Sequence, residues 1–191
     1  MAFDALNRPI TISDLPYTYD EKCPVSIEEL ILVRFIHMDL TGKEKVGEIV
    51  LNRVISNAFI EVMKIAYDIN YPLHQAVVLD NPKIKGKHQY SMQANNTAGF
   101  SCRNESGSRE EFSYSSGLAL DINPLMNPAL NPEGIWVPRN SNSYIDRSVI
   151  QTGMLNETHD ITLAFLERGF NWGGLWELPN YHYFEFSDTS L

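Results

Sequence analysis

The chain has 191 residues, a length that suits one domain with a sizeable hydrophobic core. Hydrophobic residues make up 43% and charged residues 20%, and this balance excludes a globally disordered chain. The formal net charge of -9 excludes a nucleic-acid binder of the usual basic kind, because no cluster of Lys and Arg offsets the acidity.

No apolar run approaches the ~20 residues that a membrane-spanning helix needs, so we expect no membrane span. The first 16 residues lack the basic start and apolar core of a signal peptide. We therefore expect either a cytosolic protein or one whose leader has been removed. The two cysteines, Cys23 and Cys102, leave two alternatives open. They are either buried thiols, which pack like small hydrophobic side chains, or one disulfide, which would indicate an oxidising compartment.

The first part of the chain is predicted to contain an irregular arm, a hairpin and a helix. Residues 1–24 have Pro and Asp without sustained periodicity, and we predict that they form an N-terminal arm ahead of one domain over residues 25–191. Two runs rich in β-branched residues, 31–36 and 46–51, flank a turn and predict a β-hairpin. Apolar residues then recur at helical spacing, which predicts a helix over about residues 56–69.

The middle of the chain is predicted to alternate short strands with loops. Residues 76–79 are apolar and predict a short strand, whereas the polar and basic residues 81–89 predict a surface loop. Residues 91–103 and 118–122 are predicted to lie next to the core. Prolines spread among asparagines in residues 123–143 predict a long irregular loop on the surface.

Two regular elements are predicted near the C-terminus. Residues 160–168 are a helix candidate and are followed by Gly169, a residue typical of helix ends. Residues 181–186 alternate as a final strand would. The predicted fold class is therefore α+β, with an antiparallel sheet and two or three helices.

Four segments with distinctive motifs follow one another over residues 25–186. They are Phe-Ile-His-Met-Asp-Leu-Thr-Gly at 35–42 with Gly-Glu-Ile-Val at 47–50, Ser-Met-Gln-Ala-Asn-Asn-Thr-Ala-Gly-Phe-Ser-Cys-Arg at 91–103, Gly-Leu-Ala-Leu-Asp-Ile-Asn-Pro at 117–124, and Gly-Phe-Asn-Trp-Gly-Gly-Leu-Trp at 169–176 with Asn-Tyr-His-Tyr-Phe-Glu at 180–185. In this order they resemble the M15 peptidases, zinc enzymes that cut D-alanine-containing peptides of the bacterial cell wall. These include D-alanyl-D-alanine carboxypeptidases and peptidoglycan L,D-endopeptidases. One such motif alone occurs in turns of any protein, whereas chance does not readily produce all four.

The resemblance implies a fold, a disulfide and a location. The fold would be that of the M15 peptidases, the Hedgehog/DD-peptidase-like fold. Similar proteins often carry a Cys-Pro-Val-type start and an Asn-Cys-Arg-type segment, so the resemblance favours the disulfide between Cys23 and Cys102. That bond would favour a periplasmic or extracellular location.

The resemblance also implies a site. In the family, zinc is held by a histidine three residues before the glycine of the third segment, by an aspartate four residues after it, and by a second histidine just before Phe-Glu in the fourth segment. Three protein ligands leave one position for a water molecule, whose pKa the metal lowers. An acidic residue three positions before the last histidine takes the proton of that water. An arginine at the end of the second segment stabilises the oxyanion.

In this chain the zinc positions are Tyr114, Asp121 and Tyr183, the general-base position is Asn180, and the arginine is Arg103. Asn180 has no carboxylate with which to accept a proton at neutral pH. A tyrosine binds a metal only as a phenolate, and its free pKa of about 10 opposes that form. One carboxylate and two phenols are a poor zinc set. The resemblance therefore implies a degenerate site without a metal cofactor, with zinc expected only if the site is rearranged.

Neighbouring side chains offer few replacements. His182 and Tyr183 would point to opposite faces of a regular strand, so we predict that His182 lies on the surface or behind the site. His88 falls in the basic loop and is predicted to be a solvated or core histidine. Glu185 is predicted to support its strand. Cys102 has no visible base that would make it a nucleophile.

The leading prediction for function is a catalytically degenerate M15-peptidase-like domain, a pseudoenzyme that binds a peptidoglycan-type peptide or a related ligand. Its ligand-binding residues are predicted to be Asn95, Asn96, Arg103, Tyr114, Trp176 and Tyr183. Arg103 can pair with the terminal carboxylate of a peptide without a metal. Two alternatives stay open. One is an active cell-wall peptidase with a rearranged or Tyr-ligated metal site, and the other is a protein-interaction module such as an immunity protein, inhibitor or assembly factor.

Overall fold

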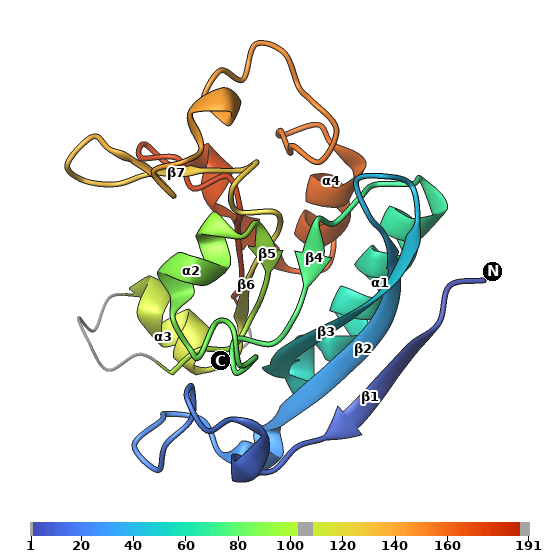
Figure 1. Ribbon diagram of the computed structural model, residues 1–191, viewed down its shortest axis with the longest axis vertical. Coiled ribbons are helices and arrows are strands. Elements are labelled where there is room, and N and C mark those ends of the chain that lie inside the picture. Colours follow the sequence, from blue (N-terminus) through green and yellow to red (C-terminus); the bar gives the residue numbers. More distant parts are fainter. Residues whose placement is uncertain (1, 103–108, 188–191) are drawn as a thin grey trace.

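The computed structural model describes residues 2–102 and 109–187, and Figure 1 shows how their elements are arranged. Two three-stranded antiparallel sheets form most of the regular structure, and the helices Arg53–Asp68 and Asp160–Leu166 pack against the first and the second sheet, respectively. These two helices also contact each other, so one hydrophobic core extends from the first sheet to the second. In the described residues no helix has the length and apolar character that crossing a membrane requires.

The first sheet carries the strands of the predicted hairpin. It is built from β1 (Ala5–Pro9), β2 (Leu30–Met38) and β3 (Glu44–Asn52), which lie in the order β1-β2-β3. β2 and β3 pair antiparallel in a register that places Phe35 opposite Gly47. The predicted hairpin is therefore confirmed, and Figure 1 shows its two strands side by side with β1 at the edge.

The first long helix, α1 (Arg53–Asp68), follows β3 directly. Asn52 caps it, because its side-chain oxygen accepts a hydrogen bond of 3.1 Å from the backbone N–H of Val54. This cap explains why the helix begins earlier than residue 56, the predicted start. One side of α1 packs on β2, and its buried residues are Ile55, Ser56, Phe59, Val62, Met63 and Ala66.

The second sheet lies toward the C-terminus. Its strands are β6 (Ala119–Asp121), β9 (Phe170–Trp172) and β10 (Tyr183–Phe186), in the order β6-β10-β9. The helix α4 (Asp160–Leu166) packs against β9 and against α1. The predicted C-terminal helix and final strand are both confirmed. Gly169 has a φ of 85°, a left-handed conformation that ends the helical segment.

The remaining elements are short. They are the parallel pair β4 (Gln75–Ala76) and β5 (Asn96–Thr97), the antiparallel pair β7 (Ala129–Leu130) and β8 (Trp136–Val137), the helices α2 (His88–Gln93) and α3 (Arg109–Ser115), and the 3-10 turns Ile12–Asp14, Ile27–Glu29, Asn142–Tyr144 and Gly173–Leu175. The α+β class is confirmed. The described residues contain four α-helices rather than two or three. The additional α2 and α3 are short and contain few apolar residues, so helical periodicity does not show in their sequence.

Two predictions about the middle of the chain need correction. Of the strand predicted over residues 76–79, only residue 76 lies in a strand, because β4 ends there. The segment 123–143 is largely irregular and is partly exposed over residues 131–143, but residues 123–129 are mostly buried, and Asn127 among them is fully buried. The amide of Asn127 donates to the carbonyl of Gly153 (3.0 Å) and accepts from the backbone N–H of Leu155 (2.7 Å). Side-chain amides thus satisfy buried backbone groups here in place of regular structure.

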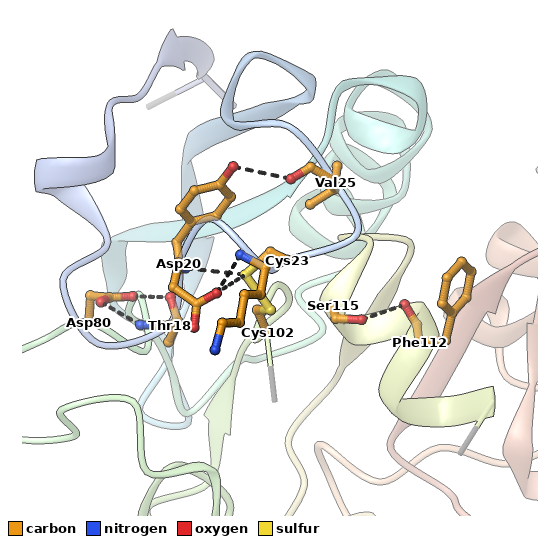
Figure 2. The surroundings of a disulfide bond; sticks show 10 residues. Thr18, Asp20, Cys23, Val25, Asp80, Cys102, Phe112 and Ser115 are labelled. Carbon is orange, nitrogen blue, oxygen red and sulfur yellow. Dashed lines mark hydrogen bonds between the residues drawn. A yellow bond between two sulfur atoms is a disulfide. The ribbon is translucent and has the colours of Figure 1, made fainter. Parts of the chain in front are cut away.

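The N-terminal arm is fastened to the rest of the molecule. Its strand β1 pairs with β2, and Cys23 forms the predicted disulfide with Cys102, with Cα atoms 5.8 Å apart. Figure 2 shows this bond beside the hydrogen bond between Thr18 and Asp80. The disulfide is confirmed, while the boundary between arm and domain at residue 24 stays a prediction.

Candidate functional site

The side chains at the three zinc positions meet where α3, β6 and β10 come together. Antiparallel pairing of β6 with β10 places Tyr183 opposite Asp121. Tyr114 comes from α3, and its ring centroid lies 5.4 Å from that of Tyr183. All three residues are buried. The structure therefore brings together the residues that the third and fourth motifs single out.

The glycine of the third motif fixes how α3 leads into β6. Gly117 has a φ of 69°, and a Cβ added there would lie 2.7 Å from the backbone nitrogen of Asn52. The Gly117 carbonyl accepts a hydrogen bond of 2.8 Å from that same nitrogen. The Asn52 side chain also donates to the carbonyl of Ser116 at 3.1 Å. Only a residue without a side chain allows this close approach, which sets the positions of Tyr114 and Asp121.

The carboxylate of Asp121 is buried and engaged on both oxygens. Oδ1 accepts a hydrogen bond from the phenol of Tyr114, and Oδ2 lies 2.8 Å from Nε2 of His88. Nε2 of His182 lies 3.6 Å from Oδ1. Burial alone raises the pKa of Asp121, but the charge of His182 and the hydrogen bond from His88 outweigh it and leave the pKa below its usual range. Asp121 is therefore ionised at neutral pH.

His88 corrects the prediction of a surface loop through residue 89. It begins α2, its side chain is 15% exposed, and its ring lies 5.5 Å from that of Tyr114. The sequence held a signal for this position. Ser91 of the second motif lies three residues further along, and residues at that spacing share one face of a helix. Because Ser91 is buried, His88 also faces inward.

His182 takes one of the two positions predicted for it, behind the site and not on the surface. Its side chain is 2% exposed, and its Nδ1 donates to the carbonyl of Asn127 at 2.7 Å. A surface position is therefore wrong. The physical reason is that β10 begins at Tyr183, so the residue before it does not follow the alternation of a regular strand. His182 instead lies behind the site and directs Nε2 toward Asp121.

The phenol of Tyr183 contacts a second buried carboxylate. It donates to Oε2 of Glu185 at 2.9 Å, and the hydroxyl of Ser113 donates to the same oxygen at 3.1 Å. Glu185 is 3% exposed. The bond from Ser113 links α3 to β10, and the bond from Tyr183 lies within β10, which agrees with the supporting role predicted for Glu185.

The side chains at the zinc positions do not fit a zinc ion. The phenols of Tyr114 and Tyr183 donate hydrogen bonds to carboxylates and so keep their protons, whereas a metal binds the phenolate. In the residues that the structure describes, no group of three or more His, Cys, Asp and Glu side chains is arranged to hold a metal. The site is instead a hydrogen-bonded group of Tyr114, Asp121, His88 and His182, which we call the Asp121 cluster.

A cleft of about 570 Å³ opens beside the Asp121 cluster. Three members of the cluster contribute to its wall, together with apolar side chains that include Leu130 and Val137. Trp176 also lines it, and its ring lies 5.4 Å from that of Tyr183. Trp176 is 37% exposed and Tyr183 is fully buried. Of the three aromatic residues predicted to bind ligand, Trp176 is therefore the accessible one, because Tyr114 is buried as well.

Asn180 lines the same cleft at the position of the general base. Its backbone N–H donates to the carbonyl of Gly173 at 2.9 Å. Its side-chain oxygen is buried and has no hydrogen-bond partner among the described residues. A carboxamide does not take a proton at neutral pH, so this position offers the cleft polarity but no base.

The other residues predicted to contact a ligand either form hydrogen bonds within the fold or lie outside the described residues. The side-chain oxygen of Asn95 accepts from the backbone N–H of Leu125 at 3.0 Å, and the amide of Asn96 bonds both backbone groups of Val77 at 2.9 Å. Both asparagines are buried and hold the loops around the site. Their side chains are therefore engaged within the fold. Arg103 lies outside the described residues, so its role stays a prediction.

The comparisons with known proteins bear on the third and fourth motifs. Residues 106–186 match a family model described as D-alanyl-D-alanine carboxypeptidase, of M15 type. This segment contains Tyr114, Asp121, Asn180 and Tyr183, and the match confirms the resemblance inferred from the motifs. No curated protein and no solved structure matches the chain.

Proposed function

We propose that this chain, whose residues 106–186 match the D-alanyl-D-alanine carboxypeptidase family model, binds a cell-wall-type peptide without hydrolysing it through zinc. The observation that carries this proposal is the state of Asp121. Its two oxygens are engaged by Tyr114 and His88, side chains of the same chain. The general-base position is occupied by the amide of Asn180. Among the described residues, the site therefore has neither a free carboxylate to hold a metal with its water nor a base to take the proton of that water.

The cleft supports retained binding. It has a volume of about 570 Å³ and combines apolar walls with an exposed indole at Trp176 and a polar group at Asn180. Concave sites with mostly apolar walls and a few polar groups are typical of ligand binding. The Cys23–Cys102 disulfide supports an oxidising compartment, in which a cell-wall peptide would be met.

Calorimetric titration with a synthetic peptide ending in D-Ala-D-Ala tests this proposal. The wild type is expected to bind, and Trp176→Ala is expected to weaken binding roughly tenfold, because the apolar area that the indole buries against the ligand contributes about 1.4 kcal/mol. Val46→Ala, at an exposed apolar residue of β3, is the control and should bind like the wild type. No binding by the wild type at millimolar peptide would contradict the proposal.

One observation favours a second candidate, an active peptidase with a rearranged site. Nε2 of His88 and of His182 both lie close to the carboxylate of Asp121, at 2.8 and 3.6 Å. Release of D-alanine from the same peptide, measured with several divalent metals added, separates the two candidates. Release that is lost in Asp121→Ala and kept in the control His74→Ala supports the peptidase. No release after long incubation excludes it.

A further inference from the structure

A second hollow adjoins the cleft and differs from it in charge. It has a volume of about 810 Å³ and shares His88, Met92 and Val137 with the cleft, so the two spaces are neighbours along one wall. Its own lining adds the cations Lys87 and Arg139 and includes no Asp or Glu. We call this space the basic hollow.

The two cations of the basic hollow are not neutralised by the described residues. Other cations of the chain pair with carboxylates, for example Arg168 with Glu61 at 2.9 Å. Lys87 and Arg139 form no such pair within the described residues, and Nζ of Lys87 lies 5.1 Å from the ring centroid of Tyr90.

Two acidic groups that contact residues of the lining are bonded within the fold. Asp80 accepts hydrogen bonds from the backbone of Tyr17 and Thr18 at 2.6 and 3.2 Å. Oδ2 of Asp121 is bonded to Nε2 of His88, and Asp121 is buried and does not line the hollow. In a chain with a net charge of -9, the basic hollow is therefore a local positive site, which favours anionic ligands.

We propose that the basic hollow binds a carboxylate of the peptide whose uncharged part lies in the cleft, so that the ligand is an acidic peptide. This inference rests on the proposed function. An extended peptide advances about 3.3–3.6 Å per residue, so neighbouring residues of one short ligand can reach both spaces. The guanidinium of Arg139 offers two parallel N–H donors that match a carboxylate, and Lys87 adds a second positive charge.

Two matched peptides test the inference. Both end in D-alanine, and they differ in one internal residue, glutamate in the first and glutamine in the second. By calorimetric titration at low salt, the wild type is expected to bind the glutamate peptide roughly three- to tenfold more tightly. This preference should shrink as salt is added, because the two cations are exposed.

Variants then locate the effect. Arg139→Ala and Lys87→Ala should each reduce the preference for glutamate and leave the affinity for the glutamine peptide unchanged. Both side chains are exposed, so both variants are expected to fold like the wild type. Lys43→Ala, which removes an exposed cation near the β2–β3 turn, should keep the preference and controls for net charge.

The outcomes separate this inference from the proposed function. Equal affinity of the wild type for the two peptides would overturn the acidic subsite and leave the proposed function standing. Binding of neither peptide would overturn both. Tighter binding of inorganic phosphate than of the glutamate peptide would contradict a peptide carboxylate as the occupant.

Discussion

The sheet of β1, β2 and β3 and the region around Asp121 are stabilised in different ways. In the first, α1 lays apolar side chains on β2, and Phe35 meets Phe59 edge to face with ring centroids 5.2 Å apart. Around Asp121, buried carboxylates, imidazoles and phenols satisfy one another. The stability of the apolar region depends on how well side-chain volumes fill the core. The stability of the polar region around Asp121 depends on every hydrogen-bond partner being present.

Around Asp121 the backbone fixes which side-chain positions meet. The turn at Gly117 and the pairing of Tyr183 with Asp121 are set by the backbone. They hold the same positions together whichever side chains stand there. In this chain those side chains pair with one another, and they do not fit a metal.

The largest expected loss is in the apolar region. Phe59 is fully buried between α1 and β2, so Phe59→Ala should lower the free energy of unfolding by about 3–5 kcal/mol. Chemical denaturation measures this value. Val54→Ala, on the exposed side of the same helix, should change it by less than about 0.5 kcal/mol. Similar losses for the two variants would show that α1 does not pack as described.

The disulfide connects the arm to the segment that precedes the site. Replacing both Cys23 and Cys102 with Ala should cost about 2–4 kcal/mol, because the bond closes a loop between residues separated by 79 positions. Denaturation of the wild type with and without a reducing agent provides the matched control. If the reductant does not change the stability of the wild type, the disulfide does not fasten the arm.

A smaller loss is expected at the Asp121 cluster. Tyr114→Phe removes a hydrogen-bond donor from a buried carboxylate and should cost about 1–3 kcal/mol, although the apolar ring remains. Tyr90→Phe removes a phenol from a half-exposed ring and should be nearly neutral. Equal stability of these two variants would mean that the Tyr114 hydroxyl does not support Asp121.

The smallest effect is expected at the β2–β3 turn and depends on pH. Hydrogen bonds from the Thr41 side chain and from the backbone N–H of Lys43 lower the pKa of Asp39 to about 2. This carboxylate therefore adds stability above its unfolded pKa of about 3.9 and loses it as the pH falls through about 2. Wild type and Asp39→Asn should differ in stability at pH 6 and converge toward pH 2. A difference that does not change with pH would contradict this.

The periodic parts of the chain were predictable because the spacing of their apolar residues indicates which positions are buried. The β2–β3 hairpin, α1 and α4 follow from spacing alone. The positions of Tyr114, Asp121 and Tyr183 followed from motif order. His88 and His182 could not be placed in this way. One depends on a helix of 6 residues and the other on where a strand begins, and both are settled by tertiary contacts. The buried amide of Asn127 was missed for the same reason.

The central claim is that the Asp121 cluster takes the place of a zinc site. It is tested most directly by measuring bound zinc after the protein is equilibrated with zinc and freed of excess metal. The wild type is expected to retain far less than one zinc per chain. The variant Tyr114→His with Tyr183→His, which restores two imidazoles around Asp121, is expected to retain about one. One zinc per chain in the wild type, lost in Asp121→Asn, would contradict the account.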